Sequence, residues 1–187
     1  MANLMEDIQL KKNHIRKYIR NLKIGISTSE KEQQASLAFQ KLELTPEFQQ
    51  AQILFIYWSL ADELSTYEFI NKWSTKKTIL LPVIEGDIMN AVRFTSEKEM
   101  KKGLLGIMEP ISKEIYNGNI DLAIVPGIAF DSNKNRLGRG KGFYDKFLTN
   151  KNLLKIGICF DFQLLDTIPY SENDIKMDKI ITPLINI

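Results

Sequence analysis

The segment from Val125 to Asp145 carries the side chains best suited to chemistry in this sequence. It reads VPGIAFDSNKNRLGRGKGFYD, and its second half alternates glycines with Arg139 and Lys141. Glycine lets the backbone approach a ligand and direct successive N–H groups at it, and a helix that follows adds free N–H groups and a positive dipole end. Together with Arg136, these donors and charges match what a polyphosphate requires. The segment therefore predicts a nucleotide phosphate site.

Two familiar phosphate-binding loops do not fit this segment. A Walker A loop needs Ser or Thr after its Gly-Lys pair to bind magnesium, whereas Gly142 follows Gly140 and Lys141 here. The dinucleotide-binding fingerprint is also absent, because the glycines are spaced GxGxG and the preceding strand lies too far upstream. Spacing alone leaves open a flexible basic loop without a ligand. A loop of about sixteen residues is expected here, and loops of that length in compact domains are usually functional.

A second group of basic residues lies near the N-terminus. Apolar residues recur there at spacings of seven, four and three, which predicts an amphipathic helix over residues 6–22. The apolar face consists of Ile8, Ile15, Ile19 and Leu22. A basic ridge at its edge consists of Lys12, Arg16, Arg20 and Lys23. Charge patterning alone favours a solvated face for this ridge, with ligand binding as the alternative. The only histidine, His14, lies on the same helix and is expected at the surface.

Four short apolar runs have the composition of strands that are buried on both faces. They span residues 52–58, 78–83, 120–125 and 154–160, and a shorter strand is expected at 179–182. Helices are expected at about 66–73, at 142–148, and from a capping box of Ser29 and Glu32 to Leu42. This alternation predicts one α/β domain over residues 1–187, with a mostly parallel sheet and helices on both faces. Ligands of such sheets bind beyond the carboxyl ends of the strands.

The composition is that of an ordinary globular domain, with 187 residues of which 44% are hydrophobic and 26% charged. A net charge of +2 is too small for a surface built to bind nucleic acid or anionic lipid. Residues 1–23 and 134–146 nevertheless hold eleven of the 25 basic and three of the 23 acidic residues. The single cysteine, Cys159, excludes an intramolecular disulfide and is expected to be inert packing. With no apolar run of membrane-spanning length, a soluble cytoplasmic protein is expected.

The string from residue 126 to 145 resembles the signature of the 5-formyltetrahydrofolate cyclo-ligase family. Further elements occur in family order, and the resemblance spans nearly the whole chain. These elements are Lys12-x-x-x-Arg16, DELST at 62–66, GIMEP at 106–110 and Asn173-Asp174. The resemblance implies a three-layer α/β fold of the NagB/RpiA/CoA-transferase type. It also implies a monomeric ligase with ATP and 5-formyltetrahydrofolate as substrates, Mg²⁺ as cofactor, and no nucleic-acid or membrane partner.

The implied reaction begins with phosphorylation of the formyl oxygen of 5-formyltetrahydrofolate by ATP. A neighbouring folate nitrogen then attacks the activated carbon, and loss of phosphate leaves 5,10-methenyltetrahydrofolate and ADP. An amide oxygen is a poor nucleophile, so the protein must align it with the γ-phosphoryl group and neutralise the charge on the transferring oxygens. We expect positioning by Lys, Arg and Mg²⁺, with no nucleophilic Ser or Cys.

The resemblance assigns roles to particular residues. Catalytic roles fall to Arg136, Arg139 and Lys141. Contacts to ATP fall to Lys12, Arg16, Arg136, Leu137, Gly138, Arg139, Gly140, Lys141, Gly142, Phe143 and Tyr144. Contacts to the folate fall to Trp58, Glu63, Arg139, Gly140, Lys141, Gly142 and Phe143. Magnesium ligands are expected in Asp145 and Asp174, since hard carboxylate oxygens suit this ion. Ordinary structural alternatives stay open, namely core packing for the aromatic residues and a helix cap for Asp145.

Two positions depart from the family pattern. Lys134 stands where the family usually has Gly, so the turn must avoid a positive φ there or accept a cost of about 1 kcal/mol. Asn173 stands where many bacterial members have His, so no role of that His carries over. Glu109 fits the family pattern, but no role follows for it from the sequence. There are two competing interpretations. One is a different phosphate-handling enzyme on the same kind of sheet, and the other is a nucleic-acid-binding module.

Overall fold

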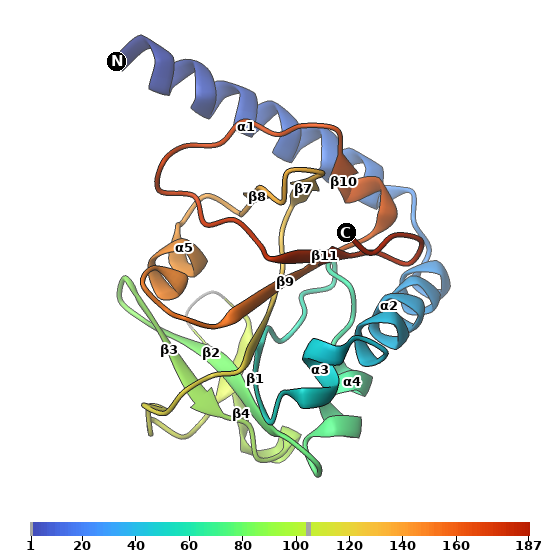
Figure 1. The fold of residues 1–187 in the computed structure, drawn as a ribbon, viewed down its shortest axis with the longest axis vertical. Coiled ribbons are helices and arrows are strands. Elements are labelled where there is room, and N and C mark those ends of the chain that lie inside the picture. Colours follow the sequence, from blue (N-terminus) through green and yellow to red (C-terminus); the bar gives the residue numbers. More distant parts are fainter. Residues whose placement is uncertain (1, 104–105) are drawn as a thin grey trace.

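The apolar runs of the sequence form the centre of a six-stranded sheet. The computed structural model describes residues 2–103 and 106–187, with the strand order β11-β9-β6-β1-β2-β3. The bounds are β1 Ile53–Ile56, β2 Thr78–Glu85, β3 Ile88–Arg93, β6 Leu122–Val125, β9 Leu154–Ile158 and β11 Lys179–Ile181. All neighbours pair in parallel except β2 with β3 (Figure 1). The predicted mostly parallel α/β sheet is confirmed, and the antiparallel edge strand β3 is an addition to it.

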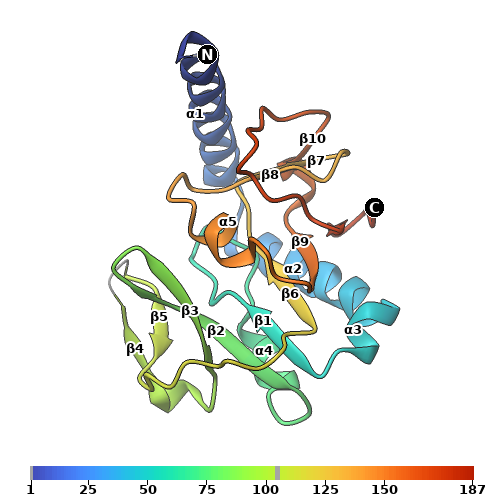
Figure 2. The same ribbon diagram turned by 60° about the vertical axis from the view of Figure 1, so that its left-hand side comes forward.

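Helices cover both faces of this sheet. Successive strand residues point to opposite sides, and the residues on both sides are apolar in β1 and β6, so both faces must be covered. Leu54 and Ile56 pack into one core with α2 (Thr28–Glu43), α3 (Pro46–Gln50) and α4 (Tyr67–Trp73). Between them, Phe55 points to the other face, where its ring stacks on Phe147 of α5 (Phe143–Leu148) at 4.4 Å between centroids. Figures 1 and 2 show these two helical layers on either side of the sheet. The three-layer prediction is therefore confirmed.

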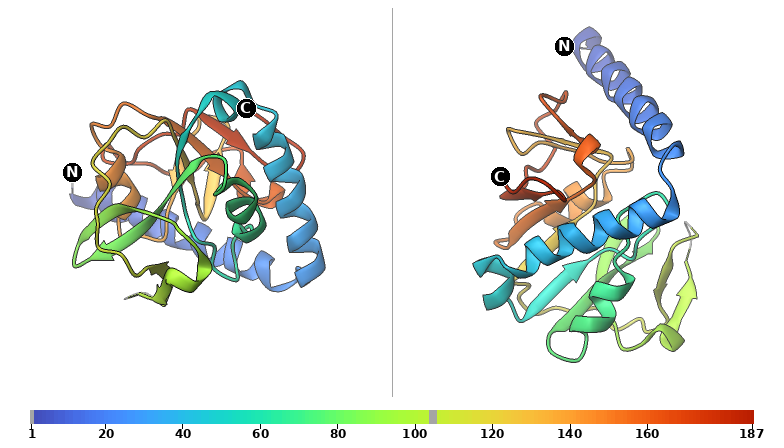
Figure 3. Two further views of the ribbon diagram at one scale, coloured as in Figure 1. Left: turned by 90° about the horizontal axis from the view of Figure 1, so that it is seen from below. Right: turned by 90° about the vertical axis from the view of Figure 1, so that its right-hand side faces the viewer.

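The long N-terminal helix α1 (Ala2–Ile24) lies outside these layers, against a second, small sheet (Figures 1 and 3). That sheet has the order β10-β7-β8, with bounds β7 Ala129–Asp131, β8 Arg136–Leu137 and β10 Leu164–Leu165, the last preceded by the 3-10 turn Asp161–Gln163. Ile19 packs there on Ala129 and Leu137. Two of the strands occupy the segment for which an irregular loop was predicted, so that prediction was wrong. Antiparallel pairing of β7 with β8 satisfies their backbone groups, which a loop would leave to water.

The face of α1 that meets the protein differs from the predicted one. Ile19 is buried as expected, but Leu22 is 37% exposed, whereas Lys12 and Lys23 are only 7% and 5% exposed. The basic ridge is thus turned largely inward, and the interpretation of a fully solvated face is wrong for Lys12 and Lys23. Burial of these ammonium groups is tolerable because Asp174 and Asp62, respectively, pair with them.

The N-cap of the second helix lies two residues before the predicted one. Ser27 is the N-cap: its hydroxyl accepts from the Glu30 N–H at 3.2 Å, and its own N–H donates to the Glu30 carboxylate at 2.9 Å. The prediction of Ser29 with Glu32 has the same spacing, so the motif alone does not separate the two.

A short hairpin completes the fold beside β2 and β3. It consists of β4 (Met100–Lys102), which follows the 3-10 turn Glu97–Glu99, and β5 (Met108–Pro110). Among the helices of the described residues, none is long and apolar enough to cross a membrane.

Candidate active site

All the residues with a predicted site role line one cavity of about 520 Å³. Its walls come from segments that follow the strands β1 and β6: Tyr57 and Trp58 follow β1, and Pro126 and Gly127 follow β6. These are carboxyl ends of parallel strands, where ligands of such sheets are expected to bind. The two basic segments of the sequence meet at this cavity, since α1 contributes Lys12 and Arg16 and the glycine-rich segment contributes residues 136–145.

Arg136 is buried in one wall and is only partly satisfied. Its Nη2 donates to Asp145 Oδ1 at 2.8 Å, and its guanidinium lies 5.5 Å from the ring centroid of Tyr144. The side chain is 4% exposed, and its Nε has no hydrogen-bond partner among the described residues. A buried N–H without a partner costs about 1–3 kcal/mol, so this donor is suited to a ligand that brings an acceptor.

Lys12 and Asp174 form a second charged pair beside Arg136. Lys12 Nζ donates to Asp174 Oδ2, which also accepts from the Ser171 N–H at 2.7 Å and the Ser171 hydroxyl at 3.1 Å. Partial burial alone would raise the pKa of Asp174, but the hydrogen bonds from Lys12 and Ser171 outweigh it and leave the pKa lowered. The neighbouring Ile175 N–H donates to Asp145 at 3.2 Å, which joins both pairs into one unit. We name Lys12, Arg136, Asp145 and Asp174 the Arg136 cluster.

The glycine-rich loop packs closely against Arg136 and Arg16, because its glycines have no side chains. A Cβ on Gly138 would lie 2.8 Å from Arg136 Nη1, and Arg16 Nε donates to the Gly138 carbonyl at 3.0 Å. Gly140 has φ +100°, a conformation that L side chains rarely adopt. Burial of Arg16 lowers its pKa, and the carboxylate of Asp174 opposes that effect. The loop therefore needs glycine at both positions to bring its backbone beside Arg16 and Arg136.

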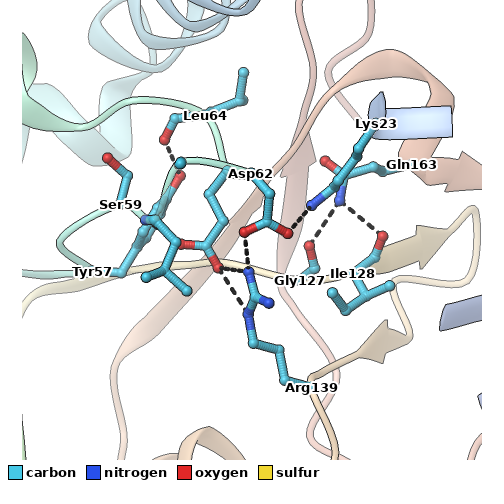
Figure 4. Close-up of polar contacts among 12 residues, drawn as sticks. Lys23, Tyr57, Ser59, Asp62, Leu64, Gly127, Ile128, Arg139 and Gln163 are labelled. Atoms are coloured by element: carbon cyan, nitrogen blue, oxygen red, sulfur yellow. Dashed lines mark hydrogen bonds and ion pairs between the residues drawn. The ribbon is translucent and has the colours of Figure 1, made fainter. Parts of the chain in front are cut away.

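A second group of charges surrounds Arg139. Its Nη2 donates to Asp62 Oδ1 at 2.6 Å and to Glu63 Oε1 at 3.0 Å, and its Nε donates to the same Glu63 oxygen at 3.3 Å. Lys23 Nζ donates to the other oxygen of Asp62 at 3.2 Å (Figure 4). Burial alone would lower the pKa of Arg139, but Glu63 and Asp62 outweigh it and raise the pKa. We name Lys23, Asp62, Glu63 and Arg139 the Arg139 cluster.

Aromatic residues form the apolar part of the cavity. Trp58 is 9% exposed, with its ring 4.8 Å from Tyr67 and 5.8 Å from Phe94 between centroids, so it is a core residue that also lines the cavity. Tyr144 likewise packs on the core through Phe55, and burial raises the pKa of its phenol. The half-buried Phe143 lines the cavity as well. These aromatic residues therefore pack on the core and also line the cavity.

Three other predicted features are placed by the structure. Lys141 is exposed and lines the cavity, and His14 is exposed on α1, as expected for a surface histidine. Cys159 is 2% exposed and burial raises the pKa of its thiol, which agrees with inert packing. Glu109, for which no role was derived, also lines the cavity.

A model of the 5-formyltetrahydrofolate cyclo-ligase family matches residues 8–183. The chain belongs to this family. A probable 5-formyltetrahydrofolate cyclo-ligase from Caenorhabditis elegans is 30% identical over 195 residues, covering 95% of each chain. A 5-formyltetrahydrofolate cyclo-ligase from Haemophilus influenzae is 28% identical, covering 91% of this chain and 97% of the relative. The resemblance seen in the sequence is thus confirmed.

Solved cyclo-ligase structures share the fold. That of Aquifex aeolicus 5,10-methenyltetrahydrofolate synthetase superposes with a TM-score of 0.85 at 30% identity, covering 94% of this chain and 91% of the other. That of a 5,10-methenyltetrahydrofolate synthetase from Mycoplasma pneumoniae gives a TM-score of 0.70 at 25% identity, covering 92% and 98%. Both the overall fold and the family are therefore shared along nearly the whole chain.

The sequence did not reveal Asp131, which fixes the segment that carries Arg136 in this cyclo-ligase. Asp131 is fully buried, and its two carboxylate oxygens accept from the N–H groups of Asn133, Asn135 and Ile168 and from the Asn135 side chain, at 2.9–3.0 Å. The signal was present as Asp-x-Asn-x-Asn, since Asp accepts readily from backbone N–H groups a few residues on. The carboxylate thus adds side-chain acceptors to a turn that is also closed by the Lys134 N–H, which donates to the Asp131 carbonyl at 2.9 Å.

The two predicted magnesium ligands offer a donor set that fits the ion. No group of three or more His, Cys, Asp or Glu residues is poised for a metal within residues 2–103 and 106–187. Asp145 and Asp174 each have one oxygen engaged by hydrogen bonds, and in the described part of the chain no hydrogen bond reaches Asp145 Oδ2 or Asp174 Oδ1. Mg²⁺ commonly takes only one or two carboxylates and completes its shell with water and phosphate oxygens. Two such oxygens on residues that line the same cavity suit it.

Proposed function

We propose that this protein converts 5-formyltetrahydrofolate and ATP to 5,10-methenyltetrahydrofolate, ADP and phosphate. The formyl oxygen forms a bond to the γ-phosphorus as the bond to ADP breaks. A neighbouring folate nitrogen then attacks the formyl carbon, and the C–O bond breaks to release phosphate, which takes up the proton that this nitrogen loses. The observation that best supports this proposal is that the residues expected to contact ATP, folate and Mg²⁺, from distant parts of the sequence, all line one 520 Å³ cavity.

The Arg136 cluster and the glycine-rich loop are suited to hold the triphosphate. The unpartnered Nε of Arg136 and the ammonium of Lys12 supply donors and charge, and Arg16 lies against Gly138 and Gly140. These groups would neutralise charge that spreads over the transferring phosphoryl oxygens. We further propose Asp145 and Asp174 as the residues that hold Mg²⁺, which when bound would add positive charge at the phosphates.

Other residues that line the cavity are suited to the folate. Glu63 offers a carboxylate to the N–H groups of an aminopyrimidine ring, and Trp58 and Phe143 offer apolar surface for stacking. Arg139 and Lys141 lie on the loop between the two binding regions, where their charges could meet the formyl oxygen and the γ-phosphoryl group. Their function in this proposal is alignment and charge stabilisation, which the chemistry requires in place of a nucleophile.

We also propose that the enzyme acts as a cytoplasmic monomer without nucleic-acid or membrane partners. The cavity is built from residues of one chain, the net charge is only +2, and the single cysteine is buried.

The test is an assay of the purified protein with 5-formyltetrahydrofolate, ATP and Mg²⁺, followed by the absorbance of the methenyl product. Product that requires both ATP and Mg²⁺ is expected. Omission of ATP and replacement of Mg²⁺ by a chelator serve as controls. No ATP-dependent product at high enzyme concentration would overturn the proposal.

A further inference from the structure

Arg139 separates two cavities of different size. One is the 520 Å³ cavity described above, and the other has a volume of about 130 Å³. Arg16 and Arg139 line both, but Glu63 lines only the larger cavity, whereas Asp62 and Lys23 line only the smaller one. The two carboxylates that hold Arg139 thus share its Nη2 but line different cavities. Asp62 lies outside the cavity in which the substrates are proposed to bind.

Glu63 has little capacity left for a ligand while it holds Arg139. Its Oε1 accepts from both Nε and Nη2 of Arg139, and its Oε2 accepts from the Leu60 N–H at 3.0 Å. Each carboxylate oxygen has two lone-pair sites, so only one acceptor site of Glu63 is open. If Glu63 recognises the pterin through two N–H groups, one on each carboxylate oxygen, at least one Arg139 hydrogen bond to Oε1 must be given up. Arg139 then needs a second partner to stay in place.

We propose that Asp62 is the positioning residue that retains Arg139 at the reacting groups while Glu63 binds the folate. This inference rests on the proposed function and assigns to Asp62 an indirect role, exerted through Arg139.

The contacts of Asp62 suit it to this role. Its Oδ1 lies 2.6 Å from Arg139 Nη2, and its Oδ2 is fixed by Lys23, whose side chain is 5% exposed (Figure 4). The carboxylate is thus anchored by a buried cation on the side away from the substrates. Burial alone would raise the pKa of Asp62, but Lys23 and Arg139 outweigh it and lower the pKa, so the carboxylate stays ionised near neutral pH.

The simplest competing explanation is that Asp62 serves only to neutralise Lys23. A buried ammonium without a partner is costly, so Asp62 would then contribute stability and nothing to turnover. The two explanations differ in what they predict for the rate of the reaction and for a variant that lacks both charges.

The first measurement compares Asp62→Asn with wild type in the methenyl assay. We expect kcat to fall about tenfold, the size typical of one lost charge-assisted hydrogen bond, with KM for 5-formyltetrahydrofolate changed less than about twofold. Asp178→Asn is the matched control, because Asp178 is also about half-exposed at 46% and pairs with a lysine, Lys155, at 2.9 Å but does not line either cavity. It should leave kcat and KM unchanged. An unchanged kcat in Asp62→Asn would overturn the proposal.

The second measurement uses the double variant Lys23→Met with Asp62→Asn. This variant removes the unpaired buried ammonium that Asp62→Asn alone leaves behind. We expect its thermal stability to recover relative to Asp62→Asn while kcat stays about tenfold below wild type. Recovery of kcat together with stability would show that Asp62 acts only on Lys23 and would overturn the positioning role. An inactive wild type would instead count against the proposed function, so the two failures are distinguishable.

Discussion

The two arginines of the proposed active site are held in contrasting ways. The Arg136 side chain is 4% exposed, and among the residues that the structure describes it has one carboxylate partner, one aromatic neighbour and a buried Nε without a partner. Arg139 is 45% exposed, and its guanidinium is shared between two carboxylates. Arg136 therefore presents a donor to a ligand before any contact is broken. Among the described residues, only Nη1 of Arg139 makes no hydrogen bond, so its Nε and Nη2 must exchange partners before they can act on a ligand.

The backbone that carries Arg136 is also held by more hydrogen bonds than the backbone that carries Arg139. Arg136 lies in β8, which pairs with β7, and the turn between these strands is closed by the buried carboxylate of Asp131. Arg139 lies between two glycines, with Gly140 at φ +100° and no strand pairing among the described residues. In the proposed function, the Arg136 region is suited to preorganised charge stabilisation, and we expect the Arg139 region to rearrange when substrate binds.

The largest effect is expected from Arg136→Ala. Loss of a preorganised donor and its charge should lower kcat by at least about a hundredfold, measured as methenyl product formation. The exposed Arg93→Ala on β3 is the control and should keep full activity. Removal of one partner of a largely buried pair costs about 3 kcal/mol, which a domain with the usual 5–15 kcal/mol tolerates, so circular dichroism should show a folded variant. A kcat within tenfold of wild type would remove Arg136 from the preorganised region.

Asp145→Asn tests whether the same region also holds the metal. The amide keeps the shape of the side chain but loses its charge, so the Mg²⁺ concentration for half-maximal activity should rise about thirtyfold, within the range seen when metal sites are perturbed. Excess Mg²⁺ should restore much of the rate. Asp166→Asn, an exposed position outside the cavity, is the control. An unchanged Mg²⁺ titration would count against Asp145 as a ligand.

At the Arg139 cluster, Glu63→Gln should act on binding more than on turnover. We expect KM for 5-formyltetrahydrofolate to rise about tenfold, the cost of one lost hydrogen bond to a charged acceptor, with KM for ATP unchanged. The exposed Glu85→Gln on β2 should leave both values unchanged. Equal increases in both KM values would mean that the two regions of the cavity are not separate in function.

The sequence was sufficient for the parts of the molecule in which local pattern and burial agree. The apolar runs identified β1, β2, β6, β9 and β11 to within a few residues, because strands that are buried on both faces consist almost entirely of apolar residues. The glycine-rich segment identified the cavity wall, because closely spaced glycines and cations have few structural uses. Family resemblance then linked Lys12 and Arg16 to that wall, and the structure brings them there.

The remaining features depend on contacts between distant residues. Lys12 and Lys23 looked solvated from charge patterning, and only their pairing with Asp174 and Asp62, more than 30 residues away, explains their burial. The same holds for Asp62, whose partners Lys23 and Arg139 come from two different segments. Strands β7 and β8 are too short, at three and two residues, for periodicity to detect. Spacing along the chain carries no information about such pairs.

The smallest effect is expected from Lys134→Gly, in the turn that leads into Arg136. Lys134 has φ +65°, so the departure from the family's usual glycine is accommodated by a left-handed non-glycine residue. Glycine relieves about 1 kcal/mol of strain but loses more conformational freedom on folding, so the free energy of unfolding should change by less than about 1 kcal/mol. The backbone bonds of Lys134 to Asp131 and Met177 do not require its side chain, and kcat should stay unchanged.

Asn150→Gly is the matched control for that change, because Asn150 has φ +59° and does not line the cavity. Denaturant unfolding should give similarly small shifts for both variants. If Lys134→Gly alone lowered kcat, the position of Arg136 would depend on the Lys134 side chain, whose Nζ donates to the Asp178 carbonyl at 3.0 Å. The position of Arg136 would then depend on a surface side chain as well as on the buried Asp131. The difference in how firmly Arg136 and Arg139 are held would then be smaller.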